Sequence, residues 1–190
     1  MSTRADRKEQ TRVALGDAAV RLFVDQGFDR TTVEDIAAAA GVSRRTFFRY
    51  FPTKEAAFFA THDDRFADFV ALVARGQERW GVWGACREAF LEVAKRYEAD
   101  RARSIAWRQV LLATPELQAH DLRLDAQWEG EVRARFLGEG MSPLRAAVQA
   151  GVMMGAVRAV LDQWYREEGD LVAMGREAFG WLDEVGRATD

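Results

Sequence analysis

The stretch "AGVSRRTFFRYF", residues Ala40 to Phe51, decides the fold because it combines the residues of a tight turn with those of a short helix. Gly41 can adopt the left-handed conformation that a turn between helices requires, and Ser43 can cap the helix that follows. Phe47 and Phe51 are four residues apart and share one helical face. The stretch therefore predicts a helix that packs through its phenylalanines and turns several arginines outward.

The residues before this turn supply the other half of a helix-turn-helix. Either Thr31 with Glu34 or Thr32 with Asp35 offers a capping box at the start of a short helix. Two helices that cross steeply need a small residue where they touch, and Ala37 meets that need. The segment from about residue 33 to residue 51 thus predicts a helix-turn-helix.

The outward face of the second helix predicts DNA binding. Arg44, Arg45 and Arg49 lie on the face that the buried phenylalanines leave free. An arginine fork can bond the O6 and N7 atoms of guanine in the major groove or clasp a phosphate. The alternative is a helical corner with a solvated, charged face. The ordered set of cap, small residue, turn glycine and apolar residues favours DNA binding over that alternative.

The rest of the chain has the features of an all-helical protein. It has 190 residues, three prolines and 48% hydrophobic residues, and no strand-like alternation of useful length. Apolar periodicity and capping residues predict helices at about 8–26, 54–76, 82–98, 100–113, 115–137, 143–166 and 170–186. We expect Gly76 to end the helix that starts at Lys54.

Residues 14–60, "ALGDAAVRLFVDQGFDRTTVEDIAAAAGVSRRTFFRYFPTKEAAFFA", resemble the DNA-binding domain of the TetR family of bacterial transcription regulators. The resemblance implies a three-helix head in residues 1–54 and a larger helical domain in residues 55–190 that binds a ligand and dimerises. It also implies operator DNA as a partner, with contacts from Thr32, Ser43, Arg44, Arg45, Thr46, Phe48, Tyr50 and Lys54. Basic residues of the N-terminal arm would add phosphate contacts: Arg4, Arg7, Lys8 and Arg12.

One position departs from the family pattern. The family commonly has tyrosine where this chain has Phe48, and a phenylalanine cannot donate a hydrogen bond to a phosphate. A phosphate contact by Phe48 is therefore in doubt. Tyr50 either compensates or packs against the next helix, and the sequence does not separate these alternatives.

The C-terminal half is rich in aromatic residues, most of which we expect to be ordinary core. We hypothesise an apolar effector cavity lined by Trp107, Leu111, Trp128, Met153, Met154 and Trp164. Such a cavity implies a hydrophobic or aromatic effector. The stretch from Arg103 to Gly140 is similar to the C-terminal domain of a subgroup that includes mycofactocin-type regulators, for which the resemblance implies acyl-CoA-like ligands.

A small-residue stripe on the helix predicted at 143–166 suggests a dimer interface. Ala147, Gly151, Gly155 and Ala159 are four residues apart and would let another helix approach closely. Packing within the chain is the alternative. The resemblance implies a four-helix interface made by two terminal helices of each subunit. A two-fold dimer would place two recognition helices about 34 to 36 Å apart on a near-palindromic operator.

Several functions lack a sequence signal. The two histidines and single cysteine have no metal-ligand spacing, and no nucleophile–base arrangement, phosphate loop or cofactor motif is present, so we predict no metal, cofactor or enzyme activity. The longest apolar runs are interrupted and the N-terminus lacks the core of a signal peptide, so we expect a cytoplasmic protein without a membrane span. The prediction is a homodimeric, ligand-released repressor. The alternative is a helical carrier of hydrophobic small molecules, followed by an enzyme built on the C-terminal bundle.

Overall fold

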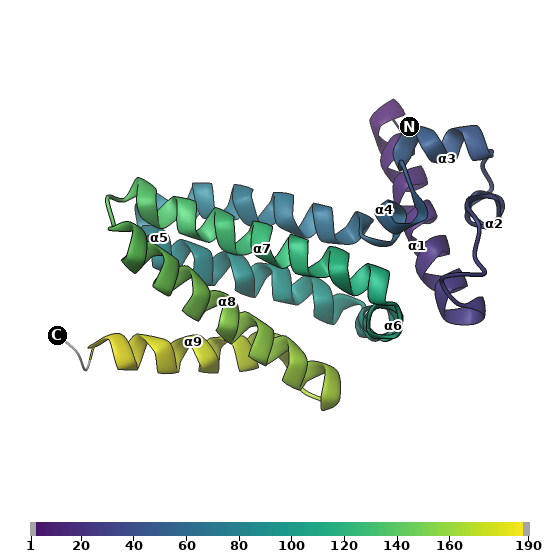
Figure 1. Ribbon diagram of the computed structural model, residues 1–190. Coiled ribbons are helices and arrows are strands. Elements are labelled where there is room, and N and C mark those ends of the chain that lie inside the picture. The colour runs from purple at the N-terminus through teal and green to yellow at the C-terminus, as the bar shows by residue number, and fades with distance from the viewer. Residues whose placement is uncertain (1–2, 188–190) are drawn as a thin grey trace. The chain divides into compact units, whose positions relative to one another are not determined.

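The computed structural model describes residues 3–187 and is all-helical, as predicted (Figure 1). The described residues form nine helices: α1 (Arg4–Gln26), α2 (Val33–Ala39), α3 (Arg44–Tyr50), α4 (Lys54–Phe58), α5 (Ala60–Ala99), α6 (Arg101–Ala113), α7 (Pro115–Gly138), α8 (Pro143–Arg166) and α9 (Leu171–Arg187). The connections between them are short, so most of the chain is available for helix packing.

The helices group into two compact units. The first, called the head unit, runs to Arg65 and also includes Ile105–His120. The second, called the bundle unit, consists of Phe66–Ser104 and the chain from Asp121 onward. Packing thus places most of α6 and the first turns of α7 with the N-terminal helices. The domain division expected after Lys54 instead cuts the chain at a single point in the sequence.

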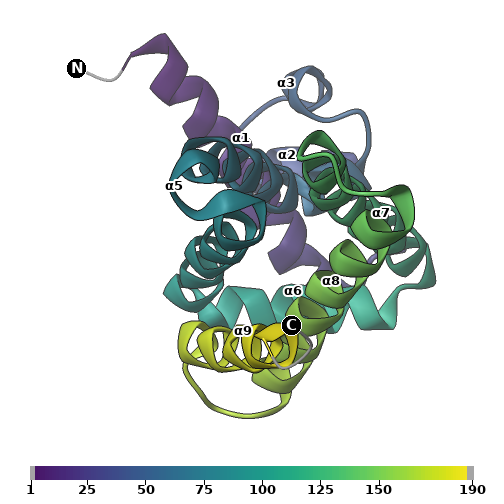
Figure 2. The same ribbon diagram turned by 90° about the vertical axis from the view of Figure 1, so that its left-hand side faces the viewer.

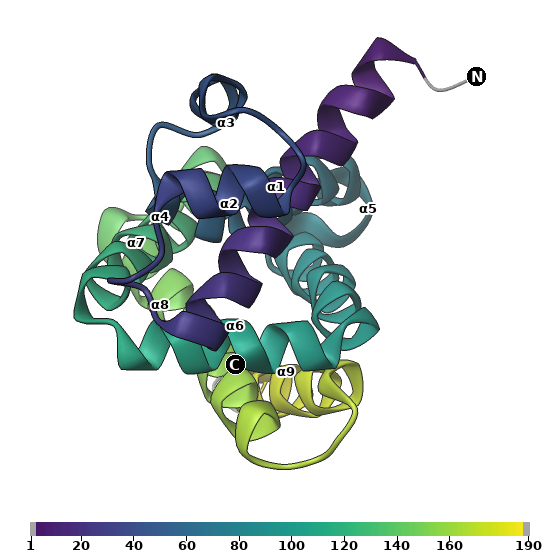
Figure 3. The same cartoon turned by 90° about the vertical axis from the view of Figure 1, so that its right-hand side faces the viewer.

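The head unit holds the predicted helix-turn-helix. Thr32 begins α2 through a capping box with Asp35, and Ser43 begins α3 by accepting a hydrogen bond from the backbone N–H of Thr46. Gly41 has φ 68°, the left-handed conformation expected for the turn. Figure 3 shows α2 lying across the view while α3 is seen nearly end-on. The two short helices therefore cross rather than run alongside each other.

The core of the head unit fixes which face of α3 stays outside. Ile36 and Phe47 are fully buried and Phe51 is nearly so. Phe47 lies between Phe48 and Phe51, with ring centroids 5.5 and 6.0 Å away. Because Phe47 and Phe51 fill the interior, the arginines of α3 are left on the surface, as the sequence predicts.

Helix α5 differs from the sequence prediction in two ways. The segment that starts at Lys54 breaks after Phe58, so α4 is a separate short helix. Gly76 does not end α5, which continues to Ala99 with one non-helical residue, Gly81, at φ 65° and ψ 176°. A Cβ on Gly76 would come within 2.7 Å of the Trp80 ring, so this glycine makes room for the indole instead of ending the helix.

The bundle unit is closed by α8 and α9, which pack against each other (Figure 1 and Figure 2). Its core includes Phe69, Phe90, Trp128 and Met153. By length and composition α8 would also suit a membrane span, which the interrupted apolar run Ala150–Leu161 did not indicate. One such helix is weak evidence for a membrane segment, since core helices of water-soluble proteins share these properties. Only 22% of its most apolar window is buried within the chain, so much of its apolar surface is open.

Candidate nucleic-acid interface

The first positions of α2 and α3 are held by their own side chains. The hydroxyl of Thr32 donates to Asp35 Oδ2 over 2.6 Å and accepts from the Asp35 N–H over 3.1 Å. The hydrogen bonds from Thr32 hold the pKa of the Asp35 carboxyl below its usual value. Ser43 Oγ donates to Thr46 Oγ1 over 3.0 Å. Thr32 and Ser43 are exposed, so the same hydroxyls that cap the helices also lie on the surface.

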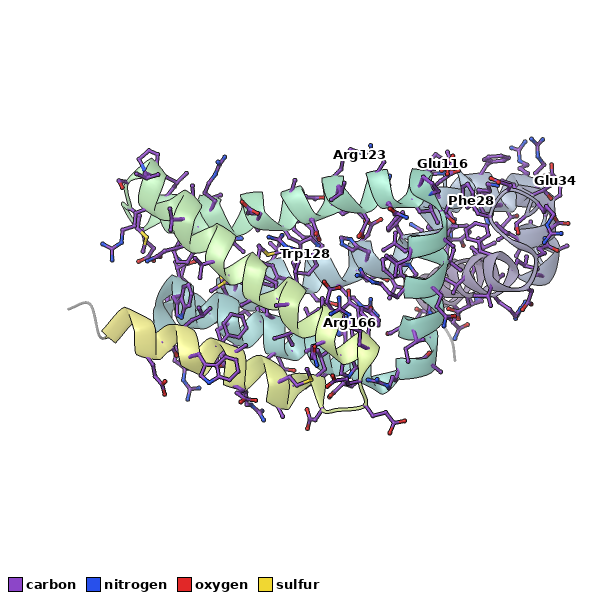
Figure 4. The ribbon with its side chains drawn as sticks, turned by 60° about the horizontal axis from the view of Figure 1, so that its bottom comes forward. Phe28, Glu34, Glu116, Arg123, Trp128 and Arg166 are labelled. Atoms are coloured by element: carbon purple, nitrogen blue, oxygen red, sulfur yellow. The ribbon has the colours of Figure 1, made fainter. Side chains whose placement is uncertain are left out.

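The arginines of α3 are not equivalent. Arg44 Nε lies 2.6 Å from Glu34, labelled in Figure 4, and its guanidinium stands 5.1 Å from the centroid of the Phe48 ring. Arg45 is exposed and forms no ion pair with any residue that the structure describes. Both partners of the Arg44 pair are more than half exposed, so the pair is weak and can open. Arg45 is the cation of α3 most available to a ligand.

The two aromatic rings of the outward face have different environments. Phe48 is 45% exposed, although its edge touches Phe47. Tyr50 is half-buried, and the guanidinium of Arg49 lies 5.3 Å from its ring centroid. The environment of Tyr50 leaves both of its predicted roles open, because it lies at the surface and also packs against a neighbour.

Lys54 has a structural role that the sequence did not reveal. Its Nζ donates to the carbonyl oxygens of Phe28 and Thr31 over 2.6 and 3.0 Å, and lies 4.0 Å from the centroid of the Phe28 ring. Lys54 thereby holds the turn between α1 and α2. An ammonium group has three donors, and the carbonyls of Phe28 and Thr31 use two of them.

The six residues of the hypothesised effector cavity fall into different surroundings. Trp107 and Leu111 belong to the head unit, where Trp107 stacks on Phe58 at 5.0 Å and donates to its carbonyl over 3.1 Å. Trp128, labelled in Figure 4, joins Met153 and Met154 in the core of the bundle unit. Trp164 is fully buried and donates to the carbonyl of Gly169 over 3.1 Å.

The bundle unit also contains an apolar hollow that the sequence hypothesis missed. It has a volume of about 50 Å³ and is bounded by α5, α8 and α9. Tyr97 brings the one hydroxyl to its lining, which otherwise consists of Phe90, Leu91, Val93, Ala94, Ala156, Val157, Val160, Leu161, Leu171, Gly175, Ala178 and Phe179. Small residues on α8 and α9 were the available signal, since Ala156 and Ala178 line the hollow and a Cβ on Gly175 would come within 2.9 Å of Leu91.

The predicted stripe on α8 is only partly covered by the described part of the chain. A Cβ placed on Gly151 or on Gly155 would meet no atom within 4 Å. Ala147 is half-buried and Ala159 is exposed. Exposed apolar side chains follow the adjacent row of the same helix: Leu144, Val148 and Val152, with 76%, 55% and 43% of their surfaces exposed. Packing within the chain thus does not account for the small residues at 151 and 155.

These features match known proteins along nearly the whole chain. Residues 15–61 match the family of bacterial regulatory proteins named tetR, and residues 80–185 match the MftR C-terminal domain. The chain belongs to the tetR family. It is a DNA-binding transcription regulator and not an enzyme, because this is a family of non-enzymatic regulators.

Individual relatives agree with the family assignment. The chain is 31% identical to the "Putative mycofactocin biosynthesis transcriptional regulator MftR" of Mycobacterium tuberculosis, with 97% of this chain and 93% of that protein covered. It is 33% identical to the transcriptional regulator TcmR of Streptomyces glaucescens, with 96% and 85% covered. The fatty acid degradation regulator FadR of Bacillus halodurans has a similar fold, with TM-score 0.66, 19% identity and coverage of 90% and 94%. The predicted similarity to TetR regulators with a mycofactocin-type C-terminal domain is confirmed.

Proposed function

We propose that this tetR-family regulator is a repressor that binds a near-palindromic operator as a homodimer. The observation that carries the proposal is the exposed cationic face of α3, where Arg45 is unpaired among the described residues and the N-terminal end is held by Ser43. The N-terminal residues of a recognition helix are those that contact base edges. Arg45 then reads a base, while Thr32, Ser43, Arg44, Thr46 and Tyr50 bind or position phosphates.

Release by an effector completes the proposal. The effector is a hydrophobic or aromatic molecule, with acyl-CoA-like compounds among the candidates because of the mycofactocin-type C-terminal domain. Either the hollow that includes Phe90, Tyr97 and Phe179 is its entry, or the buried residues Trp128, Met153 and Met154 move apart to receive it. A ligand lowers operator affinity only by its preference for the conformation that binds DNA less well.

Dimerisation is supported by the open surface of α8. The row Leu144, Val148 and Val152 and the small residues Gly151 and Gly155 make an apolar strip on a regulator whose operator contacts need two heads. A second copy of α8 with its α9 would cover this strip. In such a dimer the partner would also shield from water the apolar surface that gives α8 the composition of a membrane span.

Selection of bound sequences from a random DNA pool, at a fixed salt concentration, tests the proposal directly. We expect the recovered sequences to share a near-palindrome. Recovery of no common motif from correctly folded dimers would contradict the proposal and favour a carrier of hydrophobic molecules.

Arg45→Ala then tests the base contact within the recovered motif. Because a bidentate arginine contact gives about 1 to 3 kcal/mol of discrimination, we expect relaxed preference at one position of each half-site. Measured affinities for a set of single-base operator variants would reveal this. An unchanged preference at every position would show that Arg45 does not read a base.

A further inference from the structure

The head unit contains a cleft that none of the predicted operator or effector residues lines. It lies where the end of α1 and the turn after it meet the corner between α6 and α7, and all of these segments belong to the head unit. Phe28 of the turn and Glu116 of α7 both line it and stand close together in Figure 4. The cleft, called the corner cleft, has a volume of about 570 Å³, which is the size of a small-molecule site.

One part of the lining is apolar. Phe23 and Val110 are buried beneath the cleft, and the ring centroid of Phe28 lies 5.1 Å from that of Phe23. Val24 is 47% exposed, and Pro115 is also open to solvent. The fold thus leaves apolar surface in a hollow, where a ligand would gain free energy by removing it from water.

The charged part of the lining is mainly acidic. Asp29 and Glu116 come from different elements, and both are exposed. Neither forms an ion pair with another residue that the structure describes. Arg30 is the cation of the lining, and its Nε donates to the carbonyl oxygen of Gln26 over 2.6 Å. The two carboxylates are therefore the charged groups that fold contacts leave available.

The end of α1 adds to the negative potential of the cleft. A helix carries a partial negative charge at its C-terminal end, and the last turn of α1 contains no basic residue to offset it. Val24 and Gln26, both in that turn, line the cleft. Lys54 stands near the Phe28 ring but is not a lining residue, and two backbone carbonyls hold its ammonium group.

We propose that the corner cleft binds an organic cation with an aromatic or aliphatic body. The body covers Phe23, Phe28 and Val110, while the positive charge lies near the carboxylates of Asp29 and Glu116. The site is additional to the effector site proposed for the bundle unit, and its existence does not depend on operator binding.

Charge separates this ligand from the effector candidates described above. An acyl-CoA-like molecule carries phosphate groups, which the two carboxylates and the end of α1 would repel. A neutral apolar molecule would gain the contacts with the phenylalanines but nothing from the carboxylates. Only a cation uses both parts of the lining, so the cleft selects for positive charge.

The double variant Asp29→Asn/Glu116→Gln tests the proposal in the full-length protein. The probe is tetraphenylphosphonium, an aromatic cation, and tetraphenylborate is an anion of nearly the same shape. Isothermal titration calorimetry in sodium buffer measures the binding of each. We expect the variant to bind the cation about tenfold more weakly than the wild type, because two exposed charge contacts are lost. Binding of the anion should not weaken.

The matched control is Glu78→Gln/Glu168→Gln, which removes the same charge from exposed positions of the bundle unit. The control should bind the cation as the wild type does. An equal loss in the control would mean that net charge sets the affinity, and would overturn the proposal. It is also overturned if the wild type does not bind the cation at about 1 mM, or if the double variant binds it unchanged.

Filling the cleft gives a second, independent measurement. Ala113 lines the cleft at the exposed end of α6, so the indole of Ala113→Trp should occupy the space and weaken binding of the cation about tenfold. Ala102→Trp is the control, because Ala102 is exposed on the same helix but does not line the cleft. Thermal unfolding checks that both variants fold. Unchanged or tighter binding in Ala113→Trp would place the cation elsewhere and contradict the assignment.

Discussion

At the residue scale, Phe48 is an exposed position of α3 where a substitution can test the predicted operator contact. Phe48 is 45% exposed and is not a buried core residue. The neighbouring guanidinium of Arg44 stands 5.1 Å from the ring centroid, so the surroundings are already suited to an anionic phosphate. A hydroxyl at this position would extend from an open surface.

We therefore expect Phe48→Tyr to tighten operator binding. A new hydrogen bond contributes about 0.5 to 1.5 kcal/mol, which corresponds to about 2- to 10-fold in affinity. Fluorescence anisotropy with a labelled operator would measure the change, and thermal unfolding would confirm an unchanged fold. Weaker binding would mean that the phenyl ring packs against DNA in a way that the hydroxyl disturbs.

His62 should make stability depend on pH. Burial, then the charges of Arg65 and His120, lowers the pKa of its imidazole to about 4. In the unfolded chain the imidazole takes up a proton near pH 6.5, so its contribution is full above that pH and is lost as the pH falls toward 4. The free energy of unfolding of the wild type should therefore fall between pH 7 and pH 4. In the His62→Gln variant we expect this fall to be smaller by about 2 to 3 kcal/mol.

Urea unfolding at several pH values would measure this difference, and NMR titration of the His62 ring would locate its pKa. A ring that titrates near 6.5 in the folded protein would contradict the burial argument. Asp63, Asp64 and Arg12 are charged groups of the same region, so the comparison with His62→Gln is needed to isolate the imidazole.

Local sequence signals predicted the contacts of the site where the contacting residues are close together in the sequence, and missed those between distant residues. The helix caps at Ser43 and at Thr32 with Asp35 depend on residues only three positions apart. For the second cap, the sequence offered Thr31 with Glu34 as an equal alternative. Lys54 binds carbonyl groups 26 and 23 residues away, and no local pattern encodes that contact. Arg7 of α1 and Arg49 of α3 likewise line one cleft although they lie far apart in the sequence, so only the fold brings them together.

At the element scale, α5 shows what helical periodicity cannot predict. The apolar pattern correctly placed helices on both sides of Gly81, and the expected stop at Gly76 was wrong because Trp80 packs there. A Cβ on Gly84 would also come within 2.8 Å of Trp80. Gly76 and Gly84 thus both lie close to Trp80 beside the kink. This packing depends on residues one helical turn before and one turn after the tryptophan.

Gly81→Ala should destabilise the protein, because φ 65° is a conformation that residues with a Cβ adopt at a cost of about 1 kcal/mol or more. No atom lies within 4 Å of the added Cβ, so backbone strain and not crowding would be the cause. Gly130→Ala is the matched control in α7, where the same change should stabilise by up to about 1 kcal/mol. Denaturant unfolding would compare the two, and equal effects would show that the kink imposes no strain.

At the scale of the whole molecule, α8 has one face packed in the bundle unit and an adjacent strip of exposed apolar residues. The sequence correctly identified the small-residue spacing, but it could not tell which neighbour the stripe meets. The structure leaves Gly151 and Gly155 without a neighbouring atom within 4 Å of an added Cβ, and buries Ala146 and Ala150 on an adjacent face of the helix. One face of α8 therefore stabilises the chain itself while the other remains available to a second copy.

Gly151→Leu should separate the dimer without unfolding the chain, because the new side chain has room within one subunit but would occupy the space of a partner helix. Sedimentation analysis is expected to show monomers, and operator affinity should fall because the two heads are no longer linked. Gly130→Leu is the control, since it adds the same side chain to an equally open position of α7. A dimer that persists in Gly151→Leu would place the interface on another surface and would leave the apolar strip of α8 to a different partner.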